Sequence, residues 1–419
     1  MTTPHDAARP ASYWWAQPTP SFQPLSSDLD TDVLVVGGGI TGITLAYTLA
    51  EKGNSVGVLE AGHLAGEASG RNAGFLLAAP SEPYRERIEF WGREGARAVL
   101  QIGRRSHQRL RELIQRHDIA CEYEQKGSLR LSRTSVESED IRASLTELRH
   151  DGFPMREVAV ADVVAEHACE FFDAAFEVPE DGQVQPVQLL HGIAVAAIEK
   201  GARIHAHSRV VHAKWQAGLW EVQANGHTAR ARTLVIATNA YTPSLVPSLS
   251  ALIAPRRGQM VATAPLAERV TDKPVYAQYG YQYWRQTADG RLIIGGWRDV
   301  DFDAEAGFDT EPTPVIQAAI EKGLAQLVPG GATIEHRWAG TMGFARDGRP
   351  LVGWLDAAHH LAICAGFTGH GMGMAAGCTL DLADLLEFKR AAGIASFDPH
   401  RFPELRQKQE GIVVLGVSA

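Results

Sequence analysis

The pattern of apolar and polar positions is clearest between residues 33 and 60. Residues 33–36 (Val-Leu-Val-Val) form an apolar, β-branched run that is typical of a buried parallel strand. Residues 43–53 then carry apolar side chains at helical spacing and end at a glycine, and residues 55–60 form a second apolar run that ends at Glu60. A strand, a helix and a second strand in this order predict the start of a parallel α/β sheet.

The rest of the chain alternates between two kinds of pattern. Helical periodicity predicts helices in four further segments, residues 84–117, 134–150, 186–200 and 313–327. Short apolar runs predict strands in residues 127–132, around 204, 210 and 220–222, and in 231–236. Between residues 256 and 297 aromatic and polar side chains alternate around a turn at Asp289 and Gly290, which predicts antiparallel sheet.

Three glycines lie between the first strand and the first helix. Gly37, Gly39 and Gly42 occupy the positions of G-x-G-x-x-G. In that motif the first glycine permits a tight turn, the second lets a pyrophosphate approach the backbone, and the third lets the helix pack on the strand. The N-terminus of the helix offers N–H groups and its positive dipole end to phosphates. Because Glu60 is also placed to bind ribose hydroxyls, the segment predicts a dinucleotide site.

The following stretch, residues 61–75, is rich in glycine and small residues. Such a stretch can run beside an extended pyrophosphate and flavin, which favours FAD over NAD. Backbone and side-chain donors would come from Ser69, Gly70, Arg71, Asn72, Ala73 and Gly74. An ordinary surface loop would have a similar composition, and that alternative stays open.

These patterns predict an α/β (α+β) fold in which a mainly antiparallel β-sheet substrate domain is inserted into a Rossmann-type FAD-binding domain. At 419 residues, two connected domains are the default expectation. The FAD-binding domain is predicted in three segments, residues 31–85, 185–245 and 335–395. The substrate domain, or cap, is predicted in two, residues 86–184 and 246–334.

Residues 1–30 are predicted to form an N-terminal arm, because they are rich in proline, serine and threonine. Tyr13, Trp14 and Trp15 stand together within it. They either belong to a poorly ordered tail or dock on the body or on another subunit, and the sequence favours neither.

Composition narrows the choice of partners. The formal net charge of -9 and the short, interrupted basic clusters argue against nucleic acid and anionic membranes as partners. The four cysteines lack CxxC spacing, which fits a reduced cytoplasmic setting, and no metal site is predicted. No apolar run approaches about 18 residues, so neither export nor a membrane span is expected.

A second glycine-rich run, residues 366–377, surrounds His370. Gly371, Gly373 and Ala376 match G-x-G-x-x-A, yet no second strand with a terminal acid follows, so the match is interpreted as incidental. The run is instead predicted to be a strand-to-helix turn. Its N–H groups would face N1 and the C2 carbonyl of the flavin, where negative charge develops on reduction.

In combination, several segments resemble a known family. They are VVGGGITGITLAYTLAEKG, ASGRNAG, VQPVQLLHGIAVAAIEKG, VIATNAY, RWAGTMGFARDGRPLVG and AGFTGHGMGMAAG, which lie between about residues 30 and 390. The chain resembles the FAD-dependent amine and amino-acid oxidoreductases of the D-amino-acid-oxidase type, which include glycine oxidase and sarcosine oxidase. SYW, SGRNAG and GFTGHG look closest to the gamma-glutamylputrescine oxidase branch.

The resemblance implies oxidation of a C–N bond in a small amine or N-substituted amino acid. Hydride would pass from the carbon that carries the amine to flavin N5, and water would hydrolyse the resulting imine. The electron acceptor would be O2 or another acceptor. The particular amine, the choice between oxidase and dehydrogenase, and the oligomeric state are left open.

Three departures from the family pattern matter. Met342 stands where related enzymes carry the arginine that binds a substrate carboxylate, which argues against an α-amino acid bound in that manner. Gly340 and Arg71 stand where members with covalent flavin carry a cysteine or a histidine, so FAD is expected to be non-covalent. The lysine that promotes the oxygen reaction in sarcosine oxidase is replaced near Ile293, which argues against rapid use of O2.

The resulting candidates fall into three groups. The catalytic candidates are His370 and Arg71, with a flavin contact or a helix cap favoured for His370 over the role of general base. The expected FAD-binding residues are Gly37, Gly39, Ile40, Thr41, Gly42, Glu60, Ala61, Ser69, Gly70, Arg71, Asn72, Ala73, Gly74, Val210, Ala237, Thr238, Gly340, Gly366, Thr368, Gly369, His370, Gly371 and Met372. The substrate candidates are Phe75, Tyr281, Tyr283, Arg285 and Met342.

Two other classes of protein stay open. A flavin monooxygenase that uses NADPH would need a further nucleotide fingerprint or a second acidic FAD motif, and residues 233–241 supply neither. A non-catalytic flavin-binding module is the other alternative.

Overall fold

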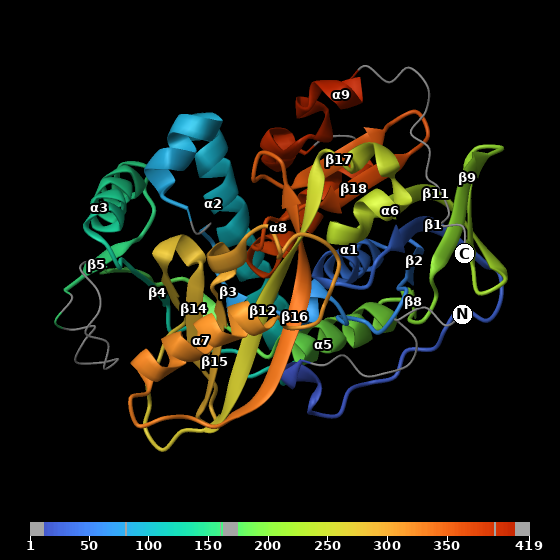
Figure 1. Ribbon diagram of the computed structural model, residues 1–419. Coiled ribbons are helices and arrows are strands. Elements are labelled where there is room, and N and C mark those ends of the chain that lie inside the picture. Colours follow the sequence, from blue (N-terminus) through green and yellow to red (C-terminus); the bar gives the residue numbers. More distant parts are fainter. Residues whose placement is uncertain (1–11, 80–81, 160, 162–174, 389–390, 407–419) are drawn as a thin grey trace.

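The computed structural model describes residues 12–79, 82–159, 161, 175–388 and 391–406 (Figure 1). Within these residues the strands form two eight-stranded sheets and one two-stranded sheet. The two large sheets correspond to the two predicted sheet types, one built on a parallel core and one mainly antiparallel. The predicted α/β (α+β) fold class is therefore confirmed.

The first sheet contains the segment of the glycine motif. Its main path is β17-β18-β11-β1-β2-β8, and β1 pairs in parallel with both β2 and β11. The strands of this path are β1 (Leu29–Val36), β2 (Val56–Leu59), β8 (Arg203–His205), β11 (His227–Ile236), β17 (Leu351–Asp356) and β18 (Leu361–Ala365). The last four residues of β1 are buried, as a central parallel strand requires.

Helices cover one face of this sheet, and a strand meander extends from it. Helix α1 (Ile40–Glu51) packs between α5 (Pro186–Glu199) and α8 (Gly371–Phe388), and α2 (Tyr84–Arg116) packs against α8. The meander is formed by β9 (Val210–Gln216) and β10 (Leu219–Ala224), which continue antiparallel from β11 (Figure 1). Because helices surround α1, its residues 40–50 are all buried.

The second sheet has the order β16-β12-β15-β14-β13-β4-β6-β5. Its strands are β4 (Ser128–Leu131), β5 (Arg156–Val158), β6 (Ala175–Val178), β12 (Ile253–Pro265), β13 (Val275–Ala277), β14 (Gln282–Gln286), β15 (Arg291–Gly296) and β16 (Ile334–Ala345). Helix α7 (Pro314–Leu327) packs on β12 and β15, and α3 (Ser135–His150) packs on β6. All pairs are antiparallel except β13 with β4.

Smaller elements complete the described chain. They are the two-stranded sheet of β3 (Phe75–Leu76) and β7 (Gly182–Gln183), and the short helices α6 (Thr242–Leu245) and α9 (Pro403–Arg406). A 3-10 helix (Tyr13–Trp15) lies in the N-terminal arm.

The predicted domain bounds and the observed sheets differ at one strand. Strand β16 pairs with β12 along almost its whole length, so it belongs to the second sheet, although residues 335–395 were assigned to the FAD-binding domain. The change of sheet falls at the turn before β17, where β16 and β17 follow each other closely in sequence. Residues 86–184, predicted as part of the substrate domain, contribute β4, β5 and β6 to the second sheet.

The N-terminal arm docks on the body. Trp14 and Trp15 are 1% and 4% exposed. The Ser12 hydroxyl donates to the Gly70 carbonyl at 2.5 Å, and Trp14 Nε1 donates to the Asn72 carbonyl at 2.6 Å. Of the two interpretations of Tyr13, Trp14 and Trp15, docking on the chain's own body is therefore correct. The hydrogen bonds of Ser12 and Trp14 also hold the loop of residues 69–74.

Candidate active site

A cavity of about 600 Å³ connects the glycine motif with the second glycine-rich run. Its size is in the range of ligand-binding pockets. Fifteen of the expected FAD-binding residues line it: Gly37, Gly39, Ile40, Thr41, Glu60, Ala61, Ser69, Arg71, Asn72, Val210, Ala237, Thr238, Gly369, Gly371 and Met372. Segments that are more than three hundred residues apart in sequence thus meet around one space.

The first glycine motif lies at one end of this cavity. Gly37 has φ +113, in a region that favours glycine, and a Cβ there would lie 2.7 Å from the Ala237 carbonyl oxygen. A Cβ at Gly42 would collide with the Gly37 carbonyl, which explains why Gly42 does not line the cavity: it lets α1 pack on the turn. A Cβ at Gly39 would lie 2.9 Å from Ser69 Oγ and narrow the cavity at the N-terminus of α1. The free N–H groups of a first helical turn are suited to bind phosphate there.

Glu60 lies at the same end, directly after β2. Its carboxylate accepts hydrogen bonds from the N–H groups of Gly38 (2.6 Å) and Gly62 (2.8 Å), which fix its orientation. Burial raises the pKa of Glu60, and these two N–H groups oppose the rise. Since a carboxylate has about four lone-pair sites, it keeps the capacity to accept hydrogen bonds from ribose hydroxyls.

The loop of residues 69–74 forms one side of the cavity and is held from several directions. Ser69 Oγ accepts from the N–H of Ile40 (3.0 Å), which ties the loop to the glycine motif. Asn72 Oδ1 accepts from the N–H of Gly74 (2.7 Å). Asn72 Nδ2 in turn donates to two carbonyls of its own loop. Gly70, Ala73 and Gly74 do not line the cavity.

Arg71 lines the cavity, but its guanidinium bonds to protein carbonyls. Nε donates to Gly66 (2.8 Å) and Nη1 donates to Ala339 (3.1 Å). A Cβ at Gly340 would lie 2.7 Å from Arg71 Cβ, so the absence of a side chain at Gly340 leaves room for Arg71. Gly340 itself does not line the cavity. This geometry favours positioning of the loop, and a guanidinium remains protonated and cannot act as a base.

The second glycine-rich run forms the other end of the cavity. Gly366, Thr368 and Gly369 have φ values of +80, +51 and +85, so the chain makes a sharp turn between β18 and α8. The N–H of Gly366 donates to Asn239 Oδ1 (3.0 Å), and the N–H of Thr368 donates to the Gly343 carbonyl (2.8 Å). Gly366, Thr368 and His370 do not line the cavity, whereas Gly369, Gly371 and Met372 do.

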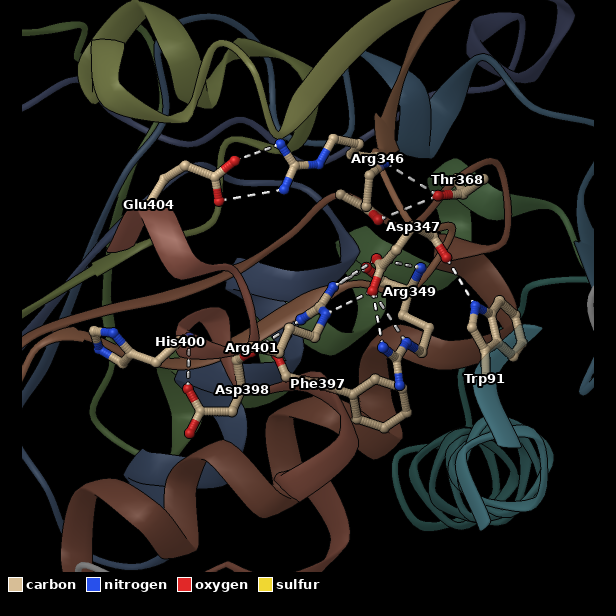
Figure 2. A network of polar contacts seen from close by, with 12 residues as sticks. Trp91, Arg346, Asp347, Arg349, Thr368, Phe397, Asp398, His400, Arg401 and Glu404 are labelled. Carbon is tan, nitrogen blue, oxygen red and sulfur yellow. Dashed lines mark hydrogen bonds and ion pairs between the residues drawn. The ribbon is translucent and has the colours of Figure 1, made fainter. Parts of the chain in front are cut away.

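A network of polar contacts adjoins this turn at Thr368 (Figure 2). The Thr368 hydroxyl accepts from the N–H of Ala345 (3.2 Å). In the next turn Asp347 accepts from Arg349 (2.9 Å) and Arg401 (2.8 Å), and these two arginines lower the pKa of Asp347 although burial opposes them. The network links this turn to the C-terminal segment, because Arg346 donates to Glu404 of α9 and Arg401 donates to Asp347.

His370 is half-buried beside the turn. Its Nδ1 lies 2.9 Å from the Thr368 carbonyl, which can only accept, so Nδ1 carries the proton. Burial lowers the pKa of His370, and Arg130 and Arg298 lower it further. The imidazole is therefore neutral near pH 7, with Nε2 as an acceptor that has no hydrogen-bond partner among the described residues.

The substrate candidates occupy different places. Met342 lines the large cavity, and its sulfur would lie 3.7 Å from a Cβ at Gly369. Phe75 and Tyr283 belong to an aromatic cluster together with Tyr276, whose ring meets His370 edge-on at 6.5 Å. Neither Phe75, Tyr281 nor Tyr283 lines the large cavity.

Arg285 lies outside the site that the sequence assigned to it. The side chain is only 1% exposed, and Nη1 donates to the carbonyls of Gly74 (3.1 Å) and Val184 (2.6 Å). Its guanidinium also stacks over Trp14, at 5.4 Å from the ring centroid, and burial lowers its pKa to about 10. Arg285 thus fixes the end of the residue 69–74 loop from behind, because the alternation of β14 points it into the core.

Several cavity residues were not among the candidates. Trp338 Nε1 donates to the Arg71 carbonyl (2.9 Å), and the Tyr241 hydroxyl donates to Glu67 (3.0 Å). Arg209, Glu67 and Asn239 also surround the cavity or its turn. Only Asn239 had a usable signal in the sequence, namely its place at the carboxyl end of a predicted strand.

Two features are absent from the described part of the chain. No helix there is long and apolar enough to cross a bilayer. No cluster of three or more histidine, cysteine or acidic side chains within the same residues is arranged to hold a metal ion.

Comparisons with known proteins agree with this geometry. Residues 32–385 match the sequence model of the family DAO, described as FAD dependent oxidoreductase. The chain is 27% identical over 408 residues to gamma-glutamylputrescine oxidoreductase of Escherichia coli, covering 95% of this chain and 93% of that protein. It is 26% identical over 373 residues to glycine oxidase of Geobacillus kaustophilus, covering 86% and 94%. The crystal structure of glycine oxidase from that organism has a TM-score of 0.77 at 24% identity and covers 89% of this chain and 99% of its own.

Proposed function

Because this chain belongs to the DAO family of FAD dependent oxidoreductases, we propose that it oxidises the C–N bond of a small amine or N-substituted amino acid. The observation that carries the proposal is the single cavity that joins the phosphate-binding turn to the residues beside His370. The relatives named above act, by their names, on an amine derivative and on glycine.

The residues of the cavity fit FAD. Gly37, Gly39 and the N-terminus of α1 would hold the pyrophosphate, and Glu60 would bind the ribose of the adenosine half. Arg71 and the turn at Gly369 to Met372 would flank the flavin end. When bound, FAD supplies the acceptor for the hydride that leaves the amine carbon. Gly340 and Arg71 stand where members with covalent flavin carry a cysteine or a histidine, so non-covalent binding is expected and acid precipitation should leave the FAD in the supernatant.

His370 and the aromatic cluster would prepare the amine. The substrate must present a neutral nitrogen for hydride loss, and the Nε2 lone pair of a neutral His370 can accept a hydrogen bond from it. Tyr276, Tyr283 and Phe75 would exclude water around the reacting carbon. His370 is thus assigned to orientation of the amine and not to strong base catalysis.

The electron acceptor is proposed to be O2 or a second acceptor such as a quinone. Ile293, which stands near the position of the lysine in sarcosine oxidase, is fully buried in β15. Its side chain is uncharged and therefore offers no charge to assist oxygen reduction. Reoxidation of the reduced enzyme by air, compared with reoxidation by a soluble quinone, measures this preference directly.

Anaerobic stopped-flow spectroscopy tests the proposed function. We expect at least one member of a panel of small amines, N-methyl amino acids and amino acids to bleach the 450 nm band of the bound flavin. Bleaching by NADPH and by no amine would replace the proposal with a monooxygenase. Failure of every reductant except dithionite would favour a flavin-binding module instead.

A further inference from the structure

A second, smaller cavity of about 50 Å³ lies next to the aromatic cluster. It is enclosed by β4, β13, the start of α2 and α3, and its polar lining consists of Glu82, Arg130, Glu137, Asp140, Ser144 and three tyrosines. Tyr276 lines this cavity, and its ring also meets the His370 ring edge-on at 6.5 Å. The volume is enough for one terminal group of a molecule, since a water molecule occupies about 30 Å³ of liquid.

Arg130 is the unusual member of this lining. It is only 6% exposed, and Nη2 donates to the Ala79 carbonyl at 2.9 Å. Nη1 is buried and has no hydrogen-bond partner among the described residues. Arg130 and Tyr276 are directly opposite in the parallel β4–β13 pair, and the guanidinium stacks over the ring at 4.6 Å from its centroid. A buried guanidinium with an unused N–H group is costly unless an acceptor reaches it.

The acids around the cavity do not supply that acceptor. Glu137 accepts from the N–H groups of Tyr279 (2.9 Å) and Arg133 (2.7 Å), and Asp140 accepts from the Tyr279 hydroxyl (2.7 Å). Burial lowers the pKa of Arg130, and the charges of Asp181 and Glu82 oppose this shift. Neither makes a hydrogen bond to Nη1.

We infer that Arg130 binds a carboxylate of the substrate in this small cavity, beside Tyr276. The inference rests on the proposed amine oxidation and narrows it: the substrate is an amine that carries an acidic group, recognised from β4. Met342 occupies the position on β16 where related enzymes would place an arginine, so the acid would be bound by a different strand. A plain alkylamine would leave Nη1 unpaired and bind more weakly.

Titration of the purified holoenzyme with butyrate tests the inference. Binding is followed by the flavin difference spectrum and, independently, by calorimetry. We expect butyrate to bind the wild type and to bind Arg130→Met at least tenfold more weakly, because a charge-assisted hydrogen bond is lost. Arg130→Lys keeps the charge but not the planar guanidinium that can donate two parallel hydrogen bonds, so its butyrate affinity should lie between those of the wild type and Arg130→Met. Butyramide, which lacks the charge, should bind both proteins equally.

Arg156→Met is the matched control. Arg156 lies on β5 of the same sheet, is largely exposed and pairs with Glu177 (Nε at 2.9 Å). It should bind butyrate like the wild type. Equal butyrate affinity in wild type and Arg130→Met, or no butyrate binding to the wild type, would overturn the inference.

Thermal unfolding separates binding from a structural role. If Arg130 serves the ligand, Arg130→Met removes an incompletely paired buried charge, and the melting temperature without ligand should stay the same or rise. A drop of several degrees together with unchanged butyrate binding would mean that Arg130 is structural.

The amine panel keeps the two proposals distinguishable. In the wild type, 4-aminobutyrate should reduce the flavin at a lower half-saturating concentration than butylamine, and the ratio should shrink at least tenfold in Arg130→Met. Reduction by amines with an unchanged ratio refutes the carboxylate site alone. Failure of all amines refutes the proposed function, and the butyrate titration still decides whether Arg130 binds an acid.

Discussion

The two ends of the large cavity are built in different ways. The phosphate-binding end comes from one continuous segment, in which β1, the turn at Gly37 to Gly42, α1, β2 and Glu60 follow one another. The other end, called the reactive end after the proposed function, is assembled from the residue 69–74 loop, β16 and the turn before α8. The aromatic cluster of Phe75, Tyr276 and Tyr283 lies beside His370 but does not line the cavity. The first end depends on local backbone geometry, and the second depends on how two sheets pack.

This difference has a consequence for tolerance to substitution. At the phosphate end, backbone groups approach so closely that a single methyl group is excluded at Gly42. At the reactive end the backbone is equally close at Gly373, where a Cβ would collide with the Leu77 carbonyl oxygen. The cavity wall itself, however, includes side chains such as Met342, which can be replaced by others of similar volume. We therefore expect changes at the first end to abolish cofactor binding and changes at the second to alter kinetics.

The largest effect is expected for Gly42→Val. The added side chain would collide with the Gly37 carbonyl and separate α1 from β1. We expect colourless protein with a loss of more than about 4 kcal/mol in the free energy of unfolding, measured by visible absorbance and urea denaturation. Gly53→Ala is the control: Gly53 has φ +87 but open space around it, so only about 1 kcal/mol should be lost. A yellow Gly42→Val protein of normal stability would contradict the placement of the motif.

The second largest effect is expected for the N-terminal arm, which contacts the residue 69–74 loop and Arg285. Trp14 is buried, stacks with Arg285 and donates to the Asn72 carbonyl. Trp14→Ala should cost about 3 to 5 kcal/mol of unfolding free energy and release part of the FAD, whereas Trp14→Phe should cost less because the ring is kept. Phe90→Ala, at a side chain that is 62% exposed, is the matched control and should change neither quantity. Full FAD retention in Trp14→Ala would show that the arm does not position the loop.

The sequence could predict the phosphate-binding end because each part of it lies close to the next along the chain. Spacing along the chain was enough to predict Gly39 and Glu60 as FAD-binding residues. Both line the large cavity, and the predicted helix and second strand around them are confirmed as α1 and β2. The same holds for the helices and for β12 to β15 of the second sheet, whose periodicity is local.

The reactive end could be predicted only in part, because its contacts join distant strands. Arg130 sits in a four-residue strand whose neighbour Tyr276 is far away in sequence, and nothing near it indicates a ligand. Arg285 was a substrate candidate because it alternates with aromatic residues on β14, and only the packing of Trp14 shows that it points into the core. Residues 335–345 of β16 were predicted as part of the FAD-binding domain for the same reason, since pairing with β12 leaves no local signal in the sequence.

A smaller effect separates the two ends by function. Glu60→Gln keeps the shape but removes the charge that would bind the ribose, so we expect the dissociation constant of FAD to rise about tenfold, by roughly 1.5 kcal/mol, with little change in the rate of flavin reduction. Met342→Leu should show the reverse pattern, with unchanged FAD affinity and a changed half-saturating amine concentration. Fluorescence titration of the apoprotein with FAD and anaerobic stopped flow measure the two quantities. If Glu60→Gln and Met342→Leu changed FAD affinity and the kinetics of flavin reduction to the same extent, the two ends of the cavity would not differ in function.

The smallest effect concerns pH. In the folded protein the pKa of His370 lies below its ordinary value, through burial first and the charges of Arg130 and Arg298 next, while Glu82 and the Thr368 carbonyl oppose the shift. The unfolded chain therefore binds a proton at His370 at a higher pH than the folded chain does. The stability that neutral His370 contributes is present above the unfolded pKa of about 6.5 and is lost as pH falls toward the folded pKa.

Wild type should consequently lose more unfolding free energy between pH 7.5 and pH 5.5 than His370→Asn, by less than about 1 kcal/mol because the side chain is half-buried. Other histidines with a lowered pKa, such as His107 and His191, act in the same direction in both proteins and cancel in the difference. Urea denaturation of the holoenzyme at the two pH values measures it. A steeper loss in His370→Asn would mean that His370 is stabilised as the cation, and its Nε2 could then no longer accept a hydrogen bond from the amine.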